Sequence, residues 1–459
     1  PFALTAGQET ALAEMNAAME SGIPMARLLQ GDVGSGKTLV AFLAALRAVE
    51  GGGQTAIMAP TELLARQHAD ASARLLEPLG IRPAYLTGNL KAQGRARLLS
   101  ALAAGEIDIV LGTHALFSKD IAYRNLALVI IDEQHRFGVT QRQAIIAKGE
   151  KSLRNPGVPH LLMMSATPIP RTLALTVFGD LDVSVIRDMP PGRKPVTTHL
   201  AKESNEGKVY DFVRKELEAG RQAYFVYPLI GGDDGDDGDD EIPAGNDGAP
   251  GEKSLKDAVS MAERLSTEIF PQYPVALVHS KIDDEEKRTV MEAFRAGEIR
   301  ILAATSVVEV GVDVPNASCM VIHHAERFGL SALHQLRGRV GRGGQAAYCF
   351  LIYSEPTEEK AGLTDDGKQR LKVMLETSDG FVIAEEDLKL RGPGHVAGIE
   401  QSGYLKLGIA DPVRDTETLI RARQSAFAML EADPGLLLPE HRRVAEVLER
   451  APPFSEAGL

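Results

Sequence analysis

The segment Gly31-Asp32-Val33-Gly34-Ser35-Gly36-Lys37-Thr38 matches the phosphate-binding pattern G-x-x-x-x-G-K-[ST]. A phosphate loop needs glycines, because its backbone wraps the anion and points N–H groups inward. Leu28-Leu29-Gln30 before the loop is typical of a strand, and apolar residues recur at helical spacing after it: Leu39, Phe42, Leu43, Leu46 and Val49. This order predicts an α/β fold whose nucleotide site includes Gly31, Gly34, Ser35, Gly36, Lys37 and Thr38.

A second segment, Ile130-Ile131-Asp132-Glu133, is an apolar strand that ends in two carboxylates. Lys37 is predicted to neutralise the β and γ phosphates, while Thr38 and Asp132 are predicted to hold Mg²⁺. Glu133 is predicted to orient and deprotonate the attacking water, because phosphoryl transfer depends on positioning and charge stabilisation. The two segments together predict a nucleotide triphosphatase.

Positive charges that could stabilise the transition state of hydrolysis lie far along the chain, in Gln335-Leu336-Arg337-Gly338-Arg339-Val340-Gly341-Arg342-Gly343. Arg339 and Arg342 are predicted to act as arginine fingers, which contribute about 10³–10⁵ in rate. The alternative is an exposed basic turn that binds a phosphate backbone. Arginines supplied from a separate domain would make hydrolysis depend on closure of a cleft.

Strand-like and helix-like segments alternate in two stretches, which predicts two doubly wound parallel sheets. The first sheet is predicted to contain residues 28–30, 56–58, 107–111, 128–131 and 161–164. The second is predicted to contain residues 223–227, 275–278, 299–303, 320–322 and 348–353. Residues 189–195, rich in Pro and Gly, are predicted to link the two, and the chain turns helical from about residue 355.

The net charge of −13 argues against a polyanionic partner, but nine acids and no base lie within residues 231–252. Without these acids the net charge is −4, which allows local basic grooves. The acidic stretch has almost no apolar residues and is predicted to be a disordered surface insert; it lacks the spacing of a Ca²⁺ site. Cys319 and Cys349 lie in apolar runs and are predicted to be buried thiols rather than a disulfide or metal site.

No apolar run approaches the ~18 residues of a membrane span, so no membrane association is expected and the location is expected to be cytoplasmic. The chain does not begin with Met, and Pro1 lies close to the first motif. We therefore expect a fragment that lacks an N-terminal domain.

The motifs Asp-Glu-x-His, Ser165-Ala166-Thr167 and Gln-x-x-Gly-Arg-x-Gly-Arg, in this order, resemble those of superfamily 2 helicases. The closer resemblance is to the RecG family of bacterial branch-migration helicases, through residues 31–38, 59–68, 132–139 and 165–172. It runs from Phe2 to at least Gly403. The resemblance implies two RecA-like parallel-sheet domains in tandem and a C-terminal helical hairpin and loop module. The expected domains are residues 1–192, 193–355 with the acidic insert 231–252, and 356–459.

The resemblance also implies functions for individual residues. Phe2 and Gln8 are expected to recognise adenine, and Gly311 and Asp313 to face the nucleotide. A larger set is expected to contact DNA or couple the domains: Pro60, Thr61, Glu62, Thr87, Gly88, Thr113, His114, Gln134, His135, Ser165, Thr167, Thr305, Gln335, Arg370, Arg391 and Gln401. Such contacts use backbone N–H, hydroxyl and short polar groups on phosphates, and carry no base code. The absence of Trp fits a protein that follows the DNA backbone.

The implied activity is ATP-dependent translocation on double-stranded DNA, which regresses stalled forks and migrates Holliday junctions in DNA repair and recombination. Implied partners are double-stranded and branched DNA and a single-stranded DNA-binding protein. A monomer in the bacterial cytoplasm, associated with the nucleoid, is expected. The separating wedge of this family is expected to precede Phe2, so weak fork specificity is expected.

Two alternatives remain open at this point. The tail segments around Arg370, 387–394 and 401–403 also resemble the transcription-repair coupling factor, a translocase that acts on RNA polymerase. In that family the Asp-Glu pair is typically followed by Gln-Arg, whereas this chain has Gln134-His135. The other alternative is a nucleotide-gated DNA clamp that binds but does not hydrolyse, against which Glu133, Arg339 and Arg342 argue.

Overall fold

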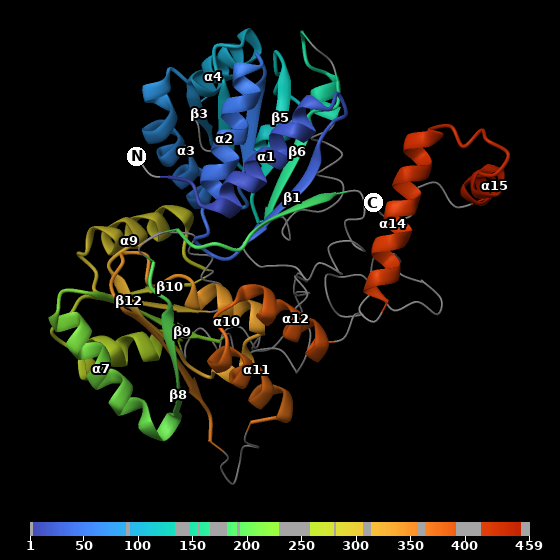
Figure 1. The fold of residues 1–459 in the computed structure, drawn as a ribbon. Helices are drawn as coiled ribbons and strands as arrows, with labels where there is room; N and C mark the ends of the chain where they lie inside the picture. Colours follow the sequence, from blue (N-terminus) through green and yellow to red (C-terminus); the bar gives the residue numbers. More distant parts are fainter. Residues whose placement is uncertain are drawn as a thin grey trace, which may run out of the picture. The chain divides into compact units, whose positions relative to one another are not determined.

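A computed structural model describes residues 3–88, 92–133, 147–154, 157–165, 181–190, 193–228, 258–279, 281–305, 314–355, 363–391 and 415–450. The chain forms two compact units, each with its own parallel sheet (Figure 1). The sheet-A unit comprises Pro1–Gly31, Gly36–Arg187 and Leu388–Leu459. The sheet-B unit comprises Asp32–Ser35 and Asp188–Asp387. The predicted α/β fold class with tandem parallel sheets and C-terminal helices is confirmed.

Sheet A has seven strands in the order β3-β4-β2-β5-β6-β1-β7, and every described pair is parallel. The strands are β1 (Ala26–Gly31), β2 (Gln54–Met58), β3 (Pro83–Leu86), β4 (Ile109–Gly112), β5 (Leu126–Ile131), β6 (His160–Ser165) and β7 (Asp182–Ile186). The helices of this unit are α1 (Ala6–Glu20), α2 (Lys37–Glu50), α3 (Glu62–Leu76), η1 (Glu77–Leu79), α4 (Ala92–Ala104), η2 (His114–Phe117), α14 (Thr416–Ala432) and α15 (Arg442–Arg450).

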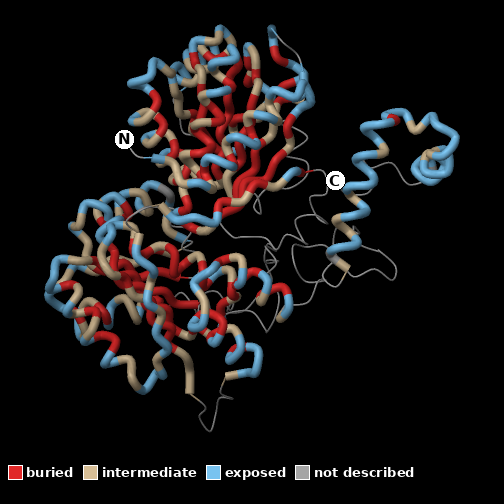
Figure 2. The backbone as a smooth tube through the Cα atoms, viewed as in Figure 1, coloured by how far each residue is buried: buried red, intermediate tan, exposed pale blue. Residues whose placement is uncertain are grey.

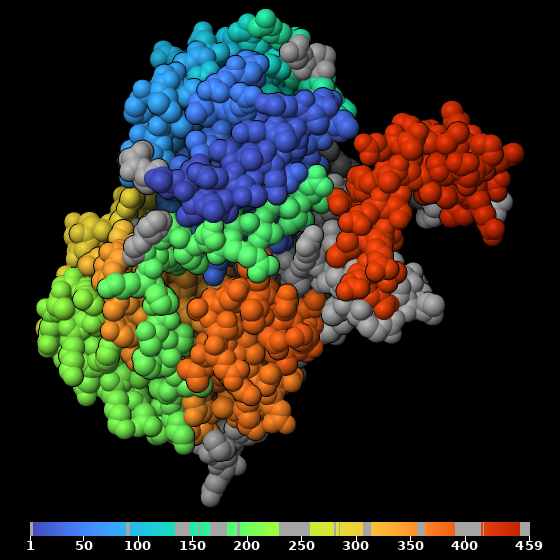
Figure 3. All heavy atoms as spheres, viewed as in Figure 1, coloured from blue at the N-terminus to red at the C-terminus, as the bar shows by residue number. Residues whose placement is uncertain are grey.

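Helix α2 follows the phosphate loop, as predicted, and packs through small residues. Its fully buried positions are Val40, Ala41, Ala44 and Ala45, together with one large residue, Phe42. The larger residues Leu39, Leu43 and Leu46 are only half buried. Helix α1 lies beside α2 on the surface of the unit, where it appears in dark blue (Figure 3). Helix α1 also contacts β7, and buried residues of α1 and α2 share one core cluster with the strands, so the two helices lie side by side on the same face of sheet A.

Sheet B has six strands in the order β10-β11-β9-β12-β13-β8, and every described pair is parallel. The strands are β8 (Val196–Lys202), β9 (Gln222–Tyr227), β10 (Val275–Val278), β11 (Ile301–Thr305), β12 (Ala317–Ile322) and β13 (Ala347–Tyr353). The helices of this unit are η4 (Glu203–Asn205), α7 (Glu206–Glu218), the helical residues 258–264 with the π-helical turn η5 (Leu265–Ile269), α9 (Asp284–Ala296), η6 (Ala325–Arg327), α10 (Leu330–Arg337), α11 (Asp365–Glu376) and α12 (Gly380–Arg391).

The core of each unit lies along its sheet, where the strands are buried while the outer surfaces of the helices are exposed (Figure 2). All ten predicted strand segments overlap strands of the structure, and β3, β7 and β8 were not predicted. Cys319 and Cys349 are buried free thiols in β12 and β13, as predicted, and burial raises the pKa of each to about 12.

The predicted linker falls between β7, the last strand of sheet A, and β8, which begins sheet B. The three-domain division at residues 192 and 355 stays a prediction, and the acidic insert 231–252 lies outside the described residues. None of the helices in the described ranges combines the length and apolar character that a membrane crossing requires.

His323 is a buried histidine of the sheet-B unit, and we expect it to make this unit sensitive to acid. Its ring is buried and stacks on Tyr227 with 4.7 Å between ring centroids. Burial, with smaller contributions from the charges of His324 and Arg264, lowers the pKa of His323 to about 3. The unfolded chain therefore binds a proton between pH 6.5 and 3 that the folded chain does not, so stability falls as pH drops through this window.

We expect acidification from pH 7 to pH 4.5 to cost about 2–3 kcal/mol through His323 alone. The variant His323→Phe should lose this contribution, while His199→Phe, at an exposed position of β8, should retain it. Urea unfolding at both pH values measures the difference. Equal pH dependence in the two variants would show that His323 is not the sensitive group.

Candidate functional site

The predicted site residues of the sheet-A unit meet at one edge of its sheet. Because all strands are parallel, their carboxyl ends share this edge, which is where ligands bind in sheets of this kind. The phosphate loop follows β1, residues 59–62 follow β2, residues 87–88 follow β3 and residues 113–114 follow β4. Asp132 and Glu133 follow β5, and Ser165 is the last residue of β6.

The phosphate loop has the backbone that its sequence predicts. Gly34 and Gly36 have φ angles of +81° and +86°, a region that favours glycine. Lys37 begins α2, and its Nζ donates a hydrogen bond to the carbonyl of Gly31 at 2.7 Å. Thr38 lies in the first turn of α2, and the N-terminus of a helix attracts anions through the positive end of its dipole. The loop therefore has the glycine conformations and the helix N-terminus that are typical of a phosphate loop.

Gln8 lies against this loop. It is buried at the start of α1, where it forms a capping box with Thr5: the N–H of Thr5 donates to Gln8 Oε1 at 3.0 Å. A Cβ at Gly36 would come within 2.3 Å of Gln8 Nε2. The capping box orients the Gln8 amide next to the loop, which supports its predicted place near the nucleotide.

Replacing Gly36 by alanine should damage the loop, since the new methyl group needs both a strained φ and space that Gln8 occupies. We expect Gly36→Ala to weaken nucleotide binding roughly tenfold or more, which corresponds to about 1.4 kcal/mol, because the methyl group strains the loop and displaces the Gln8 amide from it. Gly52 is the matched control, since it has φ +80° but open space around it. Gly52→Ala should lose about 1–2 kcal/mol of stability and keep nucleotide affinity unchanged, as titration of a fluorescent nucleotide would measure. Equal nucleotide affinity in the two variants would contradict this account.

Asp132 is held on several sides. Its Oδ2 lies 2.8 Å from His68 Nε2, its Oδ1 accepts the N–H of Glu133 at 3.0 Å, and its own N–H donates to the carbonyl of Met58 at 2.9 Å. Burial opposes ionisation, but the hydrogen bond and charge of His68 and the charge of Lys37 outweigh it and lower the pKa of Asp132. The carboxylate is therefore anionic and fixed, as a metal ligand requires.

Glu133 has a φ angle of +50°, which is rare for a residue other than glycine. Strained backbone of this kind is concentrated at functional sites, where the surrounding structure holds it. Here the Asp132 carboxylate holds it by accepting the Glu133 N–H.

A second group of predicted residues assembles at the N-terminus of α3. Glu62 Oε1 accepts hydrogen bonds from Thr87 Oγ1 at 2.7 Å and from the N–H of Gly88 at 3.3 Å. Thr61 caps α3 by accepting the N–H of Leu64 at 3.4 Å. We call Glu62, Thr87 and Gly88 the Glu62 cluster. These three residues were predicted to contact DNA, and the structure places them next to one another: Glu62 follows β2, whereas Thr87 and Gly88 follow β3.

The other predicted DNA and coupling residues of this unit differ in exposure. Pro60 is half buried and His114 is exposed, whereas Thr113 and Ser165 are buried at the ends of β4 and β6. The side chains of Thr113 and Ser165 therefore face protein in this structure, and their predicted functions stay predictions.

In the sheet-B unit the three arginines of the predicted segment differ in burial and contacts. Arg337 is buried, and its Nη1 donates to the carbonyls of Met374 at 3.0 Å and Thr377 at 2.9 Å. Arg337 therefore ties α10 to the C-terminal end of α11. Arg339, Arg342 and Gln335 are half buried, and Arg342 Nε makes a longer bond to the carbonyl of Gly338, at 3.4 Å.

Other predicted residues of this unit lie deeper or bind the helical module. Thr305 is fully buried as the last residue of β11. Arg370 in α11 donates to the carbonyl of Phe328 at 3.1 Å, which joins α11 to the loop before α10. Ser331 donates to Asp387 at 2.8 Å and joins α10 to α12. Helices α11 and α12 are thus attached to α10 at several points.

Several predicted residues lie outside the described residues: Phe2, Gln134, His135, Thr167, Gly311, Asp313 and Gln401. Arg391 is the last residue of α12, and its side chain is likewise outside the description. Their functions stay predictions.

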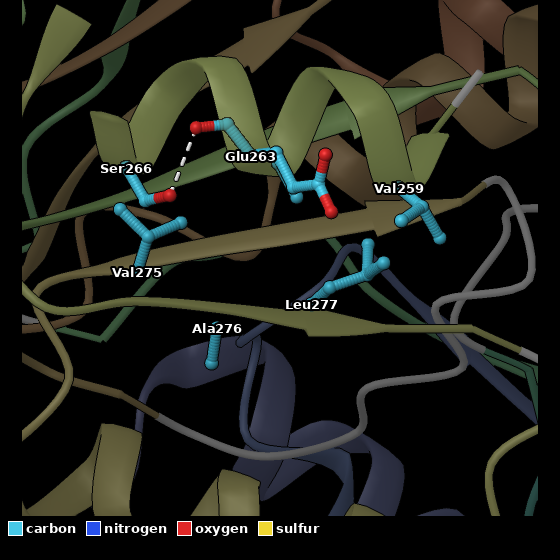
Figure 4. Close-up of a pocket in the computed structure, with 7 residues that line it drawn as sticks. Val259, Glu263, Ser266, Val275, Ala276 and Leu277 are labelled. Carbon is cyan, nitrogen blue, oxygen red and sulfur yellow. Dashed lines mark hydrogen bonds between the residues drawn. The ribbon is translucent and has the colours of Figure 1, made fainter. Parts of the chain in front are cut away.

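Two residues of the site were not predicted from the sequence. His68 was part of a recognised motif but had no assigned function, although its buried helical position with Leu64, Ala65 and Ser72 was a detectable signal. Arg337 was not separated from its two neighbouring arginines. A surface groove of the sheet-B unit lies between β10 and the helical residues 258–264 with η5, and it contains no predicted site residue. Ser266 Oγ there donates to the carbonyl of Glu263 at 2.9 Å (Figure 4).

Three family models match the chain. A DEAD/DEAH box helicase model matches residues 5–176, and a helicase conserved C-terminal domain model matches residues 253–344. The third is the C-terminal part of domain 3 of the ATP-dependent DNA helicase RecG, which matches residues 377–450.

Curated relatives include the ATP-dependent DNA helicases RecG of Treponema pallidum, 57% identical over 95% of this chain, and of Bacillus subtilis, 47% identical over 96%. The chain spans 60% of the length of each. A solved structure of RecG bound to a three-way DNA junction is 44% identical, with a TM-score of 0.70 over 91% of this chain and 50% of that one. The DUF1998 helicase MrfA bound to DNA is 16% identical, with a TM-score of 0.58 over 84% of this chain and 54% of that one, and supports the fold alone. These matches show that the chain belongs to the RecG family of helicases.

Proposed function

We propose that this chain is an ATP-driven translocase on double-stranded DNA that remodels branched DNA, by fork regression and Holliday junction branch migration. The observation that carries the proposal is the shared sheet edge, which presents the phosphate loop, Asp132 and Glu133 beside the Glu62 cluster. One edge thus offers both a site for ATP and a polar surface for a phosphate backbone. The relative that binds a three-way DNA junction supports branched DNA as the partner.

The residues at this edge fit Mg²⁺. Thr38 and the anionic Asp132 provide oxygen ligands, and Mg²⁺ in such sites takes its remaining ligands from water and phosphates. No cluster of three or more His, Cys, Asp or Glu that could hold a metal occurs among the described residues, and a site with one or two protein ligands does not need one. When bound, Mg²⁺ would neutralise charge on the phosphates.

The other functions needed for ATP hydrolysis would be provided by residues of the chain. Lys37 would leave the Gly31 carbonyl to bind the β and γ phosphates, and Glu133 would orient and deprotonate the attacking water. Arg339 and Arg342 would stabilise the transition state, whereas Arg337 is used inside the sheet-B unit. Gln8 would contact the base. Because α11 and α12 are hydrogen-bonded to α10, a movement of the arginines would be transmitted to the helical module.

The partners, location and division of the chain complete the proposal. It would act as a monomer on double-stranded and branched DNA, with a single-stranded DNA-binding protein as a further partner. It would work in the bacterial cytoplasm at the nucleoid, through three domains at residues 1–192, 193–355 and 356–459. The match to RecG domain 3 and the RecG relatives favour this function over that of a transcription-repair coupling factor.

Steady-state ATP hydrolysis with and without linear duplex DNA tests the proposal. We expect strong stimulation by duplex, because the Glu62 cluster and the hydrolytic residues share one sheet edge. A clamp that binds without turnover would release no phosphate in a single-turnover experiment. Absence of stimulation by any DNA, in a protein that binds duplex, would refute the translocase.

A further inference from the structure

The hydrogen bond between His68 and Asp132 assigns a function to His68. We propose that His68 is a positioning residue that fixes the Asp132 carboxylate for Mg²⁺ and connects it, through α3, to the Glu62 cluster. The inference rests on the proposed function, since it concerns the same ATP site. It adds a residue that lies in neither the phosphate loop nor the acidic pair.

The geometry leaves Asp132 little freedom. His68 Nε2 lies 2.8 Å from Oδ2, and the two side chains are only 10% and 14% exposed. An ionised carboxylate only accepts hydrogen bonds, so Nε2 must carry the proton and donate it. Because Oδ1 is engaged by the Glu133 N–H, both oxygens have a fixed direction. Partners of this kind orient metal ligands, and their loss typically costs about 10–100-fold in metal affinity or activity.

The helix that carries His68 also carries Glu62, which accepts the hydrogen bonds of the Glu62 cluster. Glu62 begins α3 and His68 lies six residues later, about 9 Å along the helix axis. The first turn is fixed by the Thr61 cap, and Tyr85 donates to the carbonyl of Glu62 at 3.1 Å. A shift of the cluster on contact with DNA would therefore move His68 with it. This makes α3 a direct mechanical connection between the proposed DNA contacts and the metal ligand.

Magnesium titration of nucleotide binding tests the inference without relying on catalysis. Binding of a fluorescent ADP analogue to the whole chain is measured at increasing Mg²⁺ concentrations. We expect His68→Leu to raise the apparent Kd for Mg²⁺ about 10–100-fold and to leave Mg²⁺-free nucleotide binding unchanged. His68→Gln, whose amide can reach as far as Nε2 and donate, should restore most of the Mg²⁺ affinity.

His160→Leu is the matched control. His160 Nδ1 accepts the N–H of Met25 at 2.9 Å, so this variant also removes a histidine hydrogen bond from sheet A, at the opposite ends of the strands. Its Mg²⁺ dependence should equal that of the parent protein. A folded His68→Leu with parental Mg²⁺ dependence would overturn the inference, as would a His68→Gln that behaves like His68→Leu.

A folding failure of the variant and a failure of the proposed function can both be distinguished from a failure of this inference. If His68→Leu does not fold, His68→Asn, whose amide is one carbon too short, replaces it, and parental Mg²⁺ affinity in that variant would overturn the inference. If the parent binds Mg²⁺ and nucleotide but duplex DNA does not stimulate hydrolysis, the proposed function fails while the titration still decides whether His68 positions Asp132.

Discussion

Replacement of Glu133 by glutamine is expected to lower the rate of ATP hydrolysis about 10²–10⁴-fold, the usual contribution of a general base. Glutamine keeps the size of the side chain but cannot accept the proton of the attacking water. The backbone at this position is held at φ +50° by the hydrogen bond from its N–H to Asp132, which the substitution leaves in place. Nucleotide affinity should therefore be retained. Steady-state phosphate release in the presence of duplex DNA measures the loss.

The control for this variant is Glu106→Gln, at an exposed position of the same unit. It removes the same charge from the unit without touching the sheet edge, and it should hydrolyse ATP at the parental rate. A Glu133→Gln protein that binds nucleotide and hydrolyses it within a few-fold of the parent would exclude Glu133 as the base.

Alanine at Arg342, and separately at Arg339, is expected to lower DNA-stimulated kcat by about 10³–10⁵, the contribution of an arginine finger. The effect should fall on kcat rather than on nucleotide affinity, because the cation is needed where charge develops in the transition state. Single-turnover hydrolysis with saturating duplex measures the chemical step.

Arg295→Ala is the control for these variants, since Arg295 is exposed on α9. It should keep parental kcat. If both finger variants bind DNA more weakly but retain kcat at saturating DNA, the arginines form a basic surface for the phosphate backbone instead.

The strands that the sequence did not predict have one physical property in common. β3, β7 and β8 lie at sheet edges, where only one side of a strand is paired. The central strands are continuous apolar runs because helices cover both faces. β8, by contrast, reads Val-Thr-Thr-His-Leu-Ala-Lys and is mostly exposed, and β3 begins at a proline. An edge strand that contains polar residues or a proline is therefore hard to recognise in a sequence, whereas β10, the remaining edge strand, was predicted because it reads Val-Ala-Leu-Val.

Much of the candidate site could be predicted from local motifs, because the phosphate loop and the acidic pair each consist of a few consecutive residues. The contact of His68 with Asp132 could not, since it joins residues 64 positions apart through a helix orientation. The different use of Arg337 was hidden for the same reason, because its partners lie at the end of α11. The spacing of a motif identifies functional residues that are close along the chain. Tertiary packing determines which of their side chains are used in contacts within the protein.

The most direct test of the central claim, movement along duplex DNA, is displacement of a third strand from a DNA triplex. A translocase that follows double-stranded DNA should strip the third strand in an ATP-dependent reaction that Glu133→Gln abolishes. The account predicts displacement that becomes slower as the duplex track between the entry end and the triplex is lengthened. A protein that hydrolyses ATP on duplex DNA but leaves the triplex intact at every track length would contradict it.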